Sequence, residues 1–183
     1  MITPVNDERN LAWLDLEMTG LDPDRDVILE IATIVTDSDL NLVAEGPTLA
    51  IHQSDAILEN MDPWCVDQHG RSGLTEKVRK SKVALEDAEK ATLYFLEKHL
   101  SPKKAPLCGN TIGQDRRFLV KYMPQLHDFF HYRSIDVSTV KELVLRWYPD
   151  EKHVPTKTKQ HEALEDIRES IRELAHYRKT VFK

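Results

Sequence analysis

Residues 11–20 form an apolar run that carries two acids near its end. A short, continuous apolar run of this kind predicts a buried strand. Side chains alternate between the two faces of a strand, so Asp15 and Glu17 project from the same side, with their Cα atoms roughly 6.6 Å apart. Two carboxylates placed in this way can bracket a divalent cation. A strand that ends at Leu16 and leaves both acids in water is the commoner arrangement, because acids are usually found at the surface.

The totals describe a single globular domain. The chain has 183 residues, of which 40% are hydrophobic and 31% charged, and neither a repeat nor a linker divides it, so we expect one domain over residues 1–183. The first ten residues lack the basic start and apolar core of a signal peptide, and no apolar run approaches the ~20 residues needed to cross a bilayer. We therefore expect a cytoplasmic protein without a membrane partner. Cys65 and Cys108 are isolated, which predicts two buried thiols and not a disulfide or a zinc site.

The net charge limits the possible nucleic-acid partners. Twenty-five Lys and Arg residues stand against 31 Asp and Glu residues, which gives a formal charge of −6. Long nucleic acid is held by many contacts between basic side chains and phosphates, so this excess of acids argues against a protein that grips a long duplex. A short nucleic acid held by a few placed groups remains compatible with it.

Hydrophobic periodicity predicts a mixed α/β fold. We expect strands at residues 11–17, 27–36, 42–51 with a break at 46–47, 106–108 and 133–137. We expect helices at residues 85–96, from about 112 to a stop at Pro124, from an N-cap at Ser138 to 147, and at 164–175. In the last of these helices the apolar residues form one stripe, and we expect the i,i+3 pairs Glu165–Arg168 and Glu169–Arg172 on the solvated face. This order suits a mixed sheet in which an antiparallel three-strand meander adjoins parallel strands and helices flank it. Ligands tend to bind at strand ends in such sheets, which is where Asp15 and Glu17 lie.

Three further residues are candidates for chemistry. Asp115 falls in the first turn of a predicted helix, where the helix dipole alone would favour an acid. His161 and Asp166 lie at the start of the final helix, where both could equally be surface residues. The segment from His161 to Glu165 nearly matches the zinc-protease motif H-E-x-x-H, but Glu165 occupies the place of the required second histidine, so that reading is not favoured.

Taken together, these segments resemble a known family. The sequences LDLEMTGL from Leu14, GNTIGQDRRFL from Gly109 and HEALEDI from His161 are similar, in order and spacing, to the three motifs of the DEDDh 3′–5′ exonucleases, which have the ribonuclease-H-like fold. The resemblance covers nearly the whole chain. It is strongest to a branch that degrades very short RNA, and it extends to residues 61–65, 68–74 and 131–139.

The resemblance implies a catalytic site and a cofactor. The implied ligands of two divalent cations, Mg²⁺ or Mn²⁺, are Asp15, Glu17, Asp115 and Asp166, and the implied general base is His161. Carboxylates that converge in a partly desolvated pocket repel one another unless cations are present, and hard oxygen ligands suit these ions better than zinc. Histidine suits the basic role because its pKa lies near neutrality. The implied product is a 5′ mononucleotide.

The resemblance also implies a substrate and an assembly. It indicates dinucleotides as the chief substrate, with Leu21 and Trp64 packing on the bases. The residues implied to hold the 5′ phosphate are Thr111, Arg133, Ser138 and Thr139, of which Thr111 replaces the usual serine and keeps its hydroxyl. Trp64 could instead be a core aromatic, and Ser138 and Thr139 no more than a helix cap. A homodimer is implied as well, with Tyr132 and His69 near the partner subunit.

Two other functions remain open at this level. One is a DEDDh exonuclease that trims longer single-stranded DNA or RNA, although we find no run of basic and aromatic residues leading away from the site. The other is a non-catalytic dinucleotide-binding protein that keeps the fold. The complete set of acids together with His161 argues against it, because binding alone needs no general base.

Overall fold

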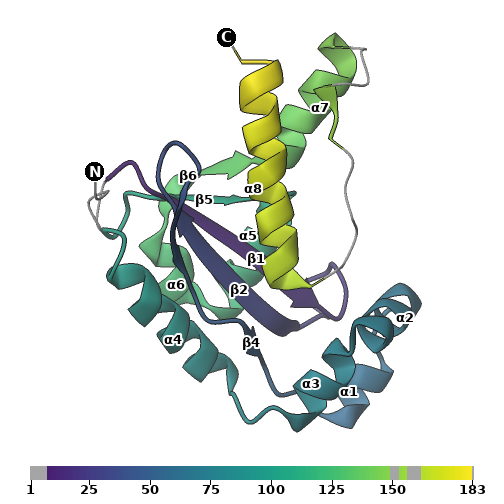
Figure 1. The fold of residues 1–183 in the computed structure, drawn as a ribbon. Coiled ribbons are helices and arrows are strands. Elements are labelled where there is room, and N and C mark those ends of the chain that lie inside the picture. Colours follow the sequence, from purple (N-terminus) through teal and green to yellow (C-terminus); the bar gives the residue numbers. More distant parts are fainter. Residues whose placement is uncertain (1–7, 149–152, 156–161, 183) are drawn as a thin grey trace.

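A mixed β-sheet forms the centre of the molecule (Figure 1). The computed structural model describes residues 8–148, 153–155 and 162–182. In that part the strands are β1 (Leu11–Met18), β2 (Ile28–Thr36), β3 (Leu42–Glu45), β4 (Leu49–Ala50), β5 (Pro106–Gly109) and β6 (His131–Asp136). The sheet order is β3-β2-β1-β5-β6, with β4 also paired to β2. The pairs around β2 are antiparallel, whereas β1–β5 and β5–β6 are parallel, so the predicted mixed sheet is confirmed.

Helices cover both faces of this sheet (Figure 1). They are α1 (Asp55–Glu59), α2 (Pro63–Ser72), α3 (Leu74–Lys80), α4 (Leu85–Glu97), α5 (Ile112–Tyr122), α6 (Pro124–Phe129), α7 (Val137–Trp147) and α8 (Ala163–Thr180). Among the helices that the structure describes, none is long and apolar enough to cross a membrane.

Strand β1 divides the core by the alternation of its side chains. Leu14 and Leu16 belong to a buried cluster that includes Phe118 of α5, and residues of α4 and α6 complete it. Trp13 belongs to a second cluster, with Ile167 of α8 and residues of α7. Because side chains two residues apart share a face, Asp15 and Glu17 lie on the α8 side, like Trp13.

The chain segment between β4 and α4 forms three short helices. Helices α1 to α3 lie beside β4 in Figure 1 and bury a third apolar cluster that includes Leu58, Leu74 and Cys65. Both cysteines are free, buried thiols, as predicted. The sequence did not predict these helices or α6.

Two expectations about the last helices were wrong. Helix α7 begins at Val137, and its N-cap is Asp136, whose side chain accepts a hydrogen bond from the Ser138 backbone N–H. An aspartate carboxylate caps a helix at least as well as a serine hydroxyl, so the cap falls two residues before the expected one. In α8, Glu169 was expected on a solvated face but is only 9% exposed.

Candidate active site

Three carboxylates from distant segments meet at the end of β1. Oxygen atoms of Asp15 and Glu17 on the strand and of Asp166 on α8 all lie within 4.8 Å of one another. Asp166 lies in the first turn of α8, and that turn packs against the same face of β1 from which the two strand acids project. The predicted convergence of these three residues is therefore present.

A fourth acid, which sequence reasoning did not identify, helps to fix the start of α8. Glu30 on β2 lies directly opposite Glu17 in the antiparallel register and is only 4% exposed. Burial raises its pKa, while Lys77 and a hydrogen bond from the Ala163 backbone N–H act in the opposite direction. An acid at this end of a helix compensates free N–H groups and the positive end of the dipole. Glu30 was detectable as the single acid inside the apolar run of β2.

Asp115 reaches the site from the opposite face of the sheet. It lies in the first turn of α5, is 6% exposed, and accepts a hydrogen bond of 3.0 Å from the Leu16 backbone N–H. Strand β5 pairs with β1 only at Ala12 and Trp13, so the Asp115 carboxylate bonds to β1 beyond the end of its pairing with β5. Leu16 lies between Asp15 and Glu17 in the sequence, so this bond holds the Asp115 carboxylate beside the two strand acids.

The electrostatics of these clustered acids favour a bound cation. Burial first, and then the charges of Asp166 and Glu30, raise the pKa of Glu17 to about 8. Burial also raises the pKa of Asp115 to about 7, against the effect of the Leu16 hydrogen bond. The pKa of Asp15 is raised well above its usual range by burial first, then by Asp115 and Glu17. Such a set of oxygen ligands fits Mg²⁺ or Mn²⁺, because each cation would replace the protons that the cluster otherwise holds.

Of the two predicted histidines, His69 lies within the described residues and His161 lies outside them. His69 is buried inside its own chain, with Nε2 at 2.9 Å from the Met18 carbonyl oxygen and Nδ1 at 3.9 Å from a Glu17 carboxylate oxygen. His69 therefore lies next to Glu17, a candidate cation ligand. Tyr132, the other residue expected near a partner, is 75% exposed.

The two residues expected to contact bases are exposed on neighbouring segments. Leu21 is 70% exposed and Trp64 is 62% exposed, so Trp64 is not a core aromatic. The Asp62 backbone N–H donates to the Thr19 carbonyl oxygen at 3.2 Å, which joins the loop of Leu21 to the start of α2. Gln114 of α5 donates to the Leu21 carbonyl oxygen and thereby fixes the loop beside Asp115.

The residues expected to hold a phosphate fall into two groups. Thr111 and Ser138 are in contact: the Thr111 backbone N–H donates to Ser138 Oγ at 2.9 Å, and the two hydroxyl oxygens are 3.0 Å apart. Thr111 has a φ of 53°, a left-handed conformation that a β-branched residue rarely adopts. Arg133 and Thr139 are exposed, and the Arg133 guanidinium lies 5.3 Å from the centroid of the Tyr132 ring.

Comparison with known proteins identifies relatives along nearly the whole chain. A family described as Exonuclease matches residues 12–174. The chain is 62% identical to the Oligoribonuclease of Pseudoalteromonas atlantica, over 96% of this chain and 97% of that one. It is 60% identical to the Oligoribonuclease of Pseudomonas aeruginosa, over 93% and 94% respectively. The corresponding identity for Colwellia psychrerythraea is 56%, over 96% and 97%.

Solved structures support the same fold. Exonuclease I of Methylocaldum szegediense matches with a TM-score of 0.72 at 19% identity, and an E. coli exonuclease I complex with single-stranded DNA matches with a TM-score of 0.76 at 15% identity. The match covers 95% and 96% of this chain but only 41% of each exonuclease I chain. At these identities the likeness concerns the fold alone.

Proposed function

Because the chain belongs to the oligoribonucleases of the exonuclease family, we propose that it is a cytoplasmic 3′–5′ exoribonuclease that hydrolyses very short RNA, chiefly dinucleotides, to 5′ mononucleotides. The observation that carries this proposal is the meeting of Asp15, Glu17 and Asp166 within 4.8 Å, from a strand and a helix that are distant in sequence. A carboxylate cluster with raised pKa values is costly to a fold and is typical of catalytic sites.

The catalytic residues have separate roles in this proposal. Two divalent cations, when bound, stabilise the attacking and leaving oxygens of an in-line displacement at phosphorus. Asp15, Glu17 and Asp166 would hold these cations. Asp115 contributes its second carboxylate oxygen, since Oδ1 accepts the Leu16 hydrogen bond. His161 accepts the proton of the attacking water.

Helix α5 supports a very short substrate. Its first turn joins three parts of the site: Thr111 precedes the helix, Gln114 binds the loop of Leu21, and Asp115 belongs to the acidic cluster. The four-residue interval from Thr111 to Asp115 corresponds to roughly 6 Å of helix axis. A phosphate held at Thr111 and Ser138 would therefore lie about one nucleotide from the acids, and Arg133 could reach the same phosphate with paired hydrogen bonds. Thr139 follows Ser138 on the exposed side of α7.

We also propose that Leu21 and Trp64 pack on the two bases. Both side chains are large, apolar and exposed, and the segments that carry them are joined through Thr19 and Asp62. In the proposed homodimer, the exposed Tyr132 contacts the partner subunit. We propose that His69 also lies near the partner subunit.

Cleavage of 5′-labelled RNAs of two to seven nucleotides tests the proposal. We expect cleavage that depends on Mg²⁺ or Mn²⁺ and that is fastest for the dinucleotide. Asp115→Ala should abolish it, whereas Asp128→Ala, which removes an exposed acid of α6, should not. Equal rates at all lengths would indicate an exonuclease of longer single strands, and no metal-dependent cleavage would indicate a dinucleotide-binding protein.

The role of His161 has its own test. General-base catalysis is worth about 10² to 10⁴ in rate, so His161→Ala should lower kcat by a factor in that range while calorimetry shows unchanged Mn²⁺ binding. Activity within about threefold of the parent would exclude the general-base role.

A further inference from the structure

Helix α8 presents a polar stripe to the interior of the protein. Asp166, Ser170, Glu173 and Tyr177 follow one another at intervals of four, three and four residues, which places them on one face of the helix. Ser170 is 4% exposed, Glu173 2% and Tyr177 0%. Polar groups are buried at a cost unless they are bonded, so a stripe of this kind needs partners.

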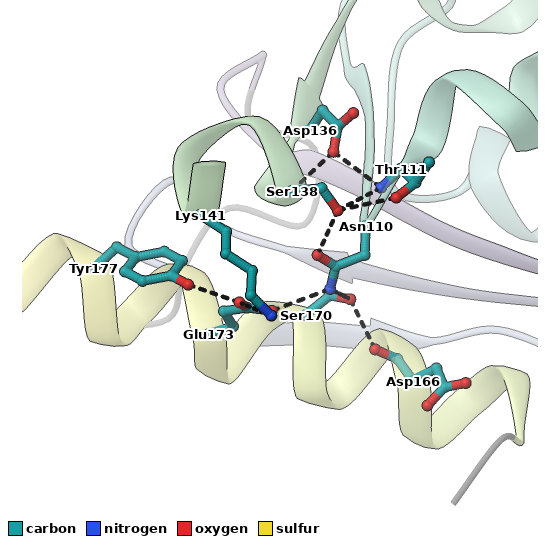
Figure 2. A network of polar contacts seen from close by, with 9 residues as sticks. All are labelled: Asn110, Thr111, Asp136, Ser138, Lys141, Asp166, Ser170, Glu173 and Tyr177. Carbon is teal, nitrogen blue, oxygen red and sulfur yellow. Dashed lines mark hydrogen bonds and ion pairs between the residues drawn. The ribbon is translucent and has the colours of Figure 1, made fainter. Parts of the chain in front are cut away.

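Asn110 is the partner that joins this stripe to the phosphate pocket, by which we mean Thr111 and Ser138. Its side-chain Nδ2 donates to Ser170 Oγ at 2.6 Å and to Glu173 Oε2 at 3.3 Å, and its Oδ1 accepts from Ser138 Oγ at 3.1 Å. Figure 2 shows the Asn110 amide between the pocket on one side and α8 on the other. The preceding Gly109 allows this position, because a Cβ there would lie 2.9 Å from the Leu14 carbonyl oxygen.

Donor and acceptor chemistry gives this network one consistent set of hydrogen-bond directions. The Glu173 carboxylate accepts from the Tyr177 hydroxyl and faces the Lys141 ammonium, so it selects the Asn110 orientation in which Nδ2 faces α8 and Oδ1 faces Ser138. Ser138 has one hydroxyl hydrogen, and donating it to Asn110 leaves Thr111 as the donor between the two hydroxyls. On the other side, Ser170 donates to the backbone carbonyl oxygen of Asp166 at 2.8 Å.

We propose that Asn110, oriented by Glu173, is a positioning residue that couples occupation of the phosphate pocket to the alignment of Asp166. The inference rests on the proposed function. When a phosphate oxygen accepts a hydrogen bond from the Thr111 or Ser138 hydroxyl, the hydrogen bonds of Ser138 Oγ change. Ser138 Oγ is the donor to Asn110 Oδ1, so the change reaches Asn110. Asn110 is bonded in turn to Ser170, and Ser170 to the turn of α8 that carries Asp166. A 5′ phosphate on the substrate therefore assists the chemical step as well as binding.

Two dinucleotide substrates separate these contributions: one with a 5′ phosphate and one with a 5′ hydroxyl. In the parent protein, we expect the 5′ phosphate to raise kcat and to lower KM. In Asn110→Ala, the advantage in kcat should fall about tenfold, within the 5- to 150-fold range typical of coupling between sites. Affinity for the 5′-phosphorylated dinucleotide, measured by calorimetry in EDTA, should stay within about threefold of the parent, because Arg133 and the Thr111 hydroxyl remain.

Asn10→Ala is the matched control. Asn10 is another buried asparagine, 1% exposed, and its Nδ2 bonds to the His99 carbonyl oxygen. Its loss should lower the melting temperature without changing the kcat advantage of the 5′ phosphate.

The outcomes distinguish the failure of this inference from failure of the proposed function. If the parent cleaves neither dinucleotide in the presence of metal, the proposed function is wrong. If the parent cleaves both and Asn110→Ala lowers both rates by the same factor, Asn110 has only a structural role and the coupling is overturned. A change confined to KM would overturn it as well, since Asn110 would then serve the pocket alone.

Discussion

Helix α8 carries two acids about two turns apart whose surroundings are opposite in character. Asp166 faces Asp15 and Glu17, so that three carboxylates share a space within 4.8 Å. Glu173 instead meets donors: the Tyr177 hydroxyl lies at 2.7 Å, the Asn110 amide at 3.3 Å and the Lys141 ammonium at 3.8 Å. Three carboxylates gather at the first position, whereas donors surround the second, as Figure 2 shows for Glu173.

The difference separates an acid that serves the fold from acids that serve chemistry. A buried carboxylate with donors around it can stabilise the folded state and fix the orientation of its neighbours. A carboxylate beside other carboxylates destabilises the folded state until a cation binds. The strongest tests of this comparison change an acid to its amide at each position.

The largest effect is expected from Asp166→Asn. Losing a cation ligand costs several kcal/mol of transition-state stabilisation, and each 1.36 kcal/mol is a factor of ten, so kcat should fall about 10³-fold. The same change removes a negative charge from the cluster, so the melting temperature in EDTA should rise. Single-turnover kinetics and calorimetry measure the two effects. Activity within tenfold of the parent, or a lower melting temperature in EDTA, would contradict the assigned role.

The second prediction concerns pH and metal. The pKa of Glu17 is raised to about 8 and that of Asp115 to about 7, so the metal-free folded state keeps protons that the unfolded chain has already lost. Stability should therefore fall as pH rises from about 5 to about 8 and change little from these groups above that, since the unfolded state binds fewer protons across the window. Mg²⁺ should raise the melting temperature more at the upper end.

Calorimetry of the parent and of Glu17→Gln, in EDTA and in Mg²⁺, provides the measurement. The substitution should make the metal-free pH dependence shallower, because one of the titrating groups is gone. A metal-free melting temperature that rises across the window in the parent would show that the cluster does not hold these protons.

The sequence predicts the acidic site only in part. The strand of Asp15 and Glu17 and the face they share followed from alternation alone, because a buried strand has a fixed side-chain period. The approach of Asp166 needed the family motifs, since no local pattern shows which face of α8 meets the sheet. Its apolar residues suggested one buried stripe, yet Ser170 and Glu173 are buried too.

The region of α1 to α3 shows a second limit. These helices have 5, 10 and 7 residues, and helices this short depend on tertiary contacts for their stability. Their apolar cluster includes Leu29 of β2 and supplies those contacts, but its residues are scattered along the sequence. Asn110 was likewise invisible as a functional residue, because its role depends on groups 60 and 63 residues away.

A smaller effect is expected from Glu173→Gln. A glutamine offers one accepting oxygen and a donor group in place of two accepting oxygens, so one of the buried donors that face Glu173 loses its bond. That cost is about 1 to 3 kcal/mol of unfolding free energy. Denaturant titration should show the loss, and kcat should fall by less than about tenfold, far less than in Asp166→Asn. A gain in stability would mean that Glu173 is as poorly compensated as the acidic cluster.

The smallest effect is expected from Tyr177→Phe, which removes one donor from Glu173 and leaves the ring in the core. The hydroxyl donates to Glu173 Oε1, and Lys141 approaches the same oxygen, so the carboxylate stays compensated. We expect a loss of about 1 kcal/mol, or roughly 2 to 4 °C in melting temperature for a protein of this size. Tyr94→Phe is the control, because Tyr94 is 65% exposed and should tolerate the change. Since Asn110 would still be oriented by Glu173, the kcat advantage of a 5′ phosphate should be kept. If Tyr177→Phe loses this kcat advantage, the orientation of Asn110 depends on the whole polar stripe of α8. Glu173 and Asp166 would then belong to one continuous hydrogen-bond network.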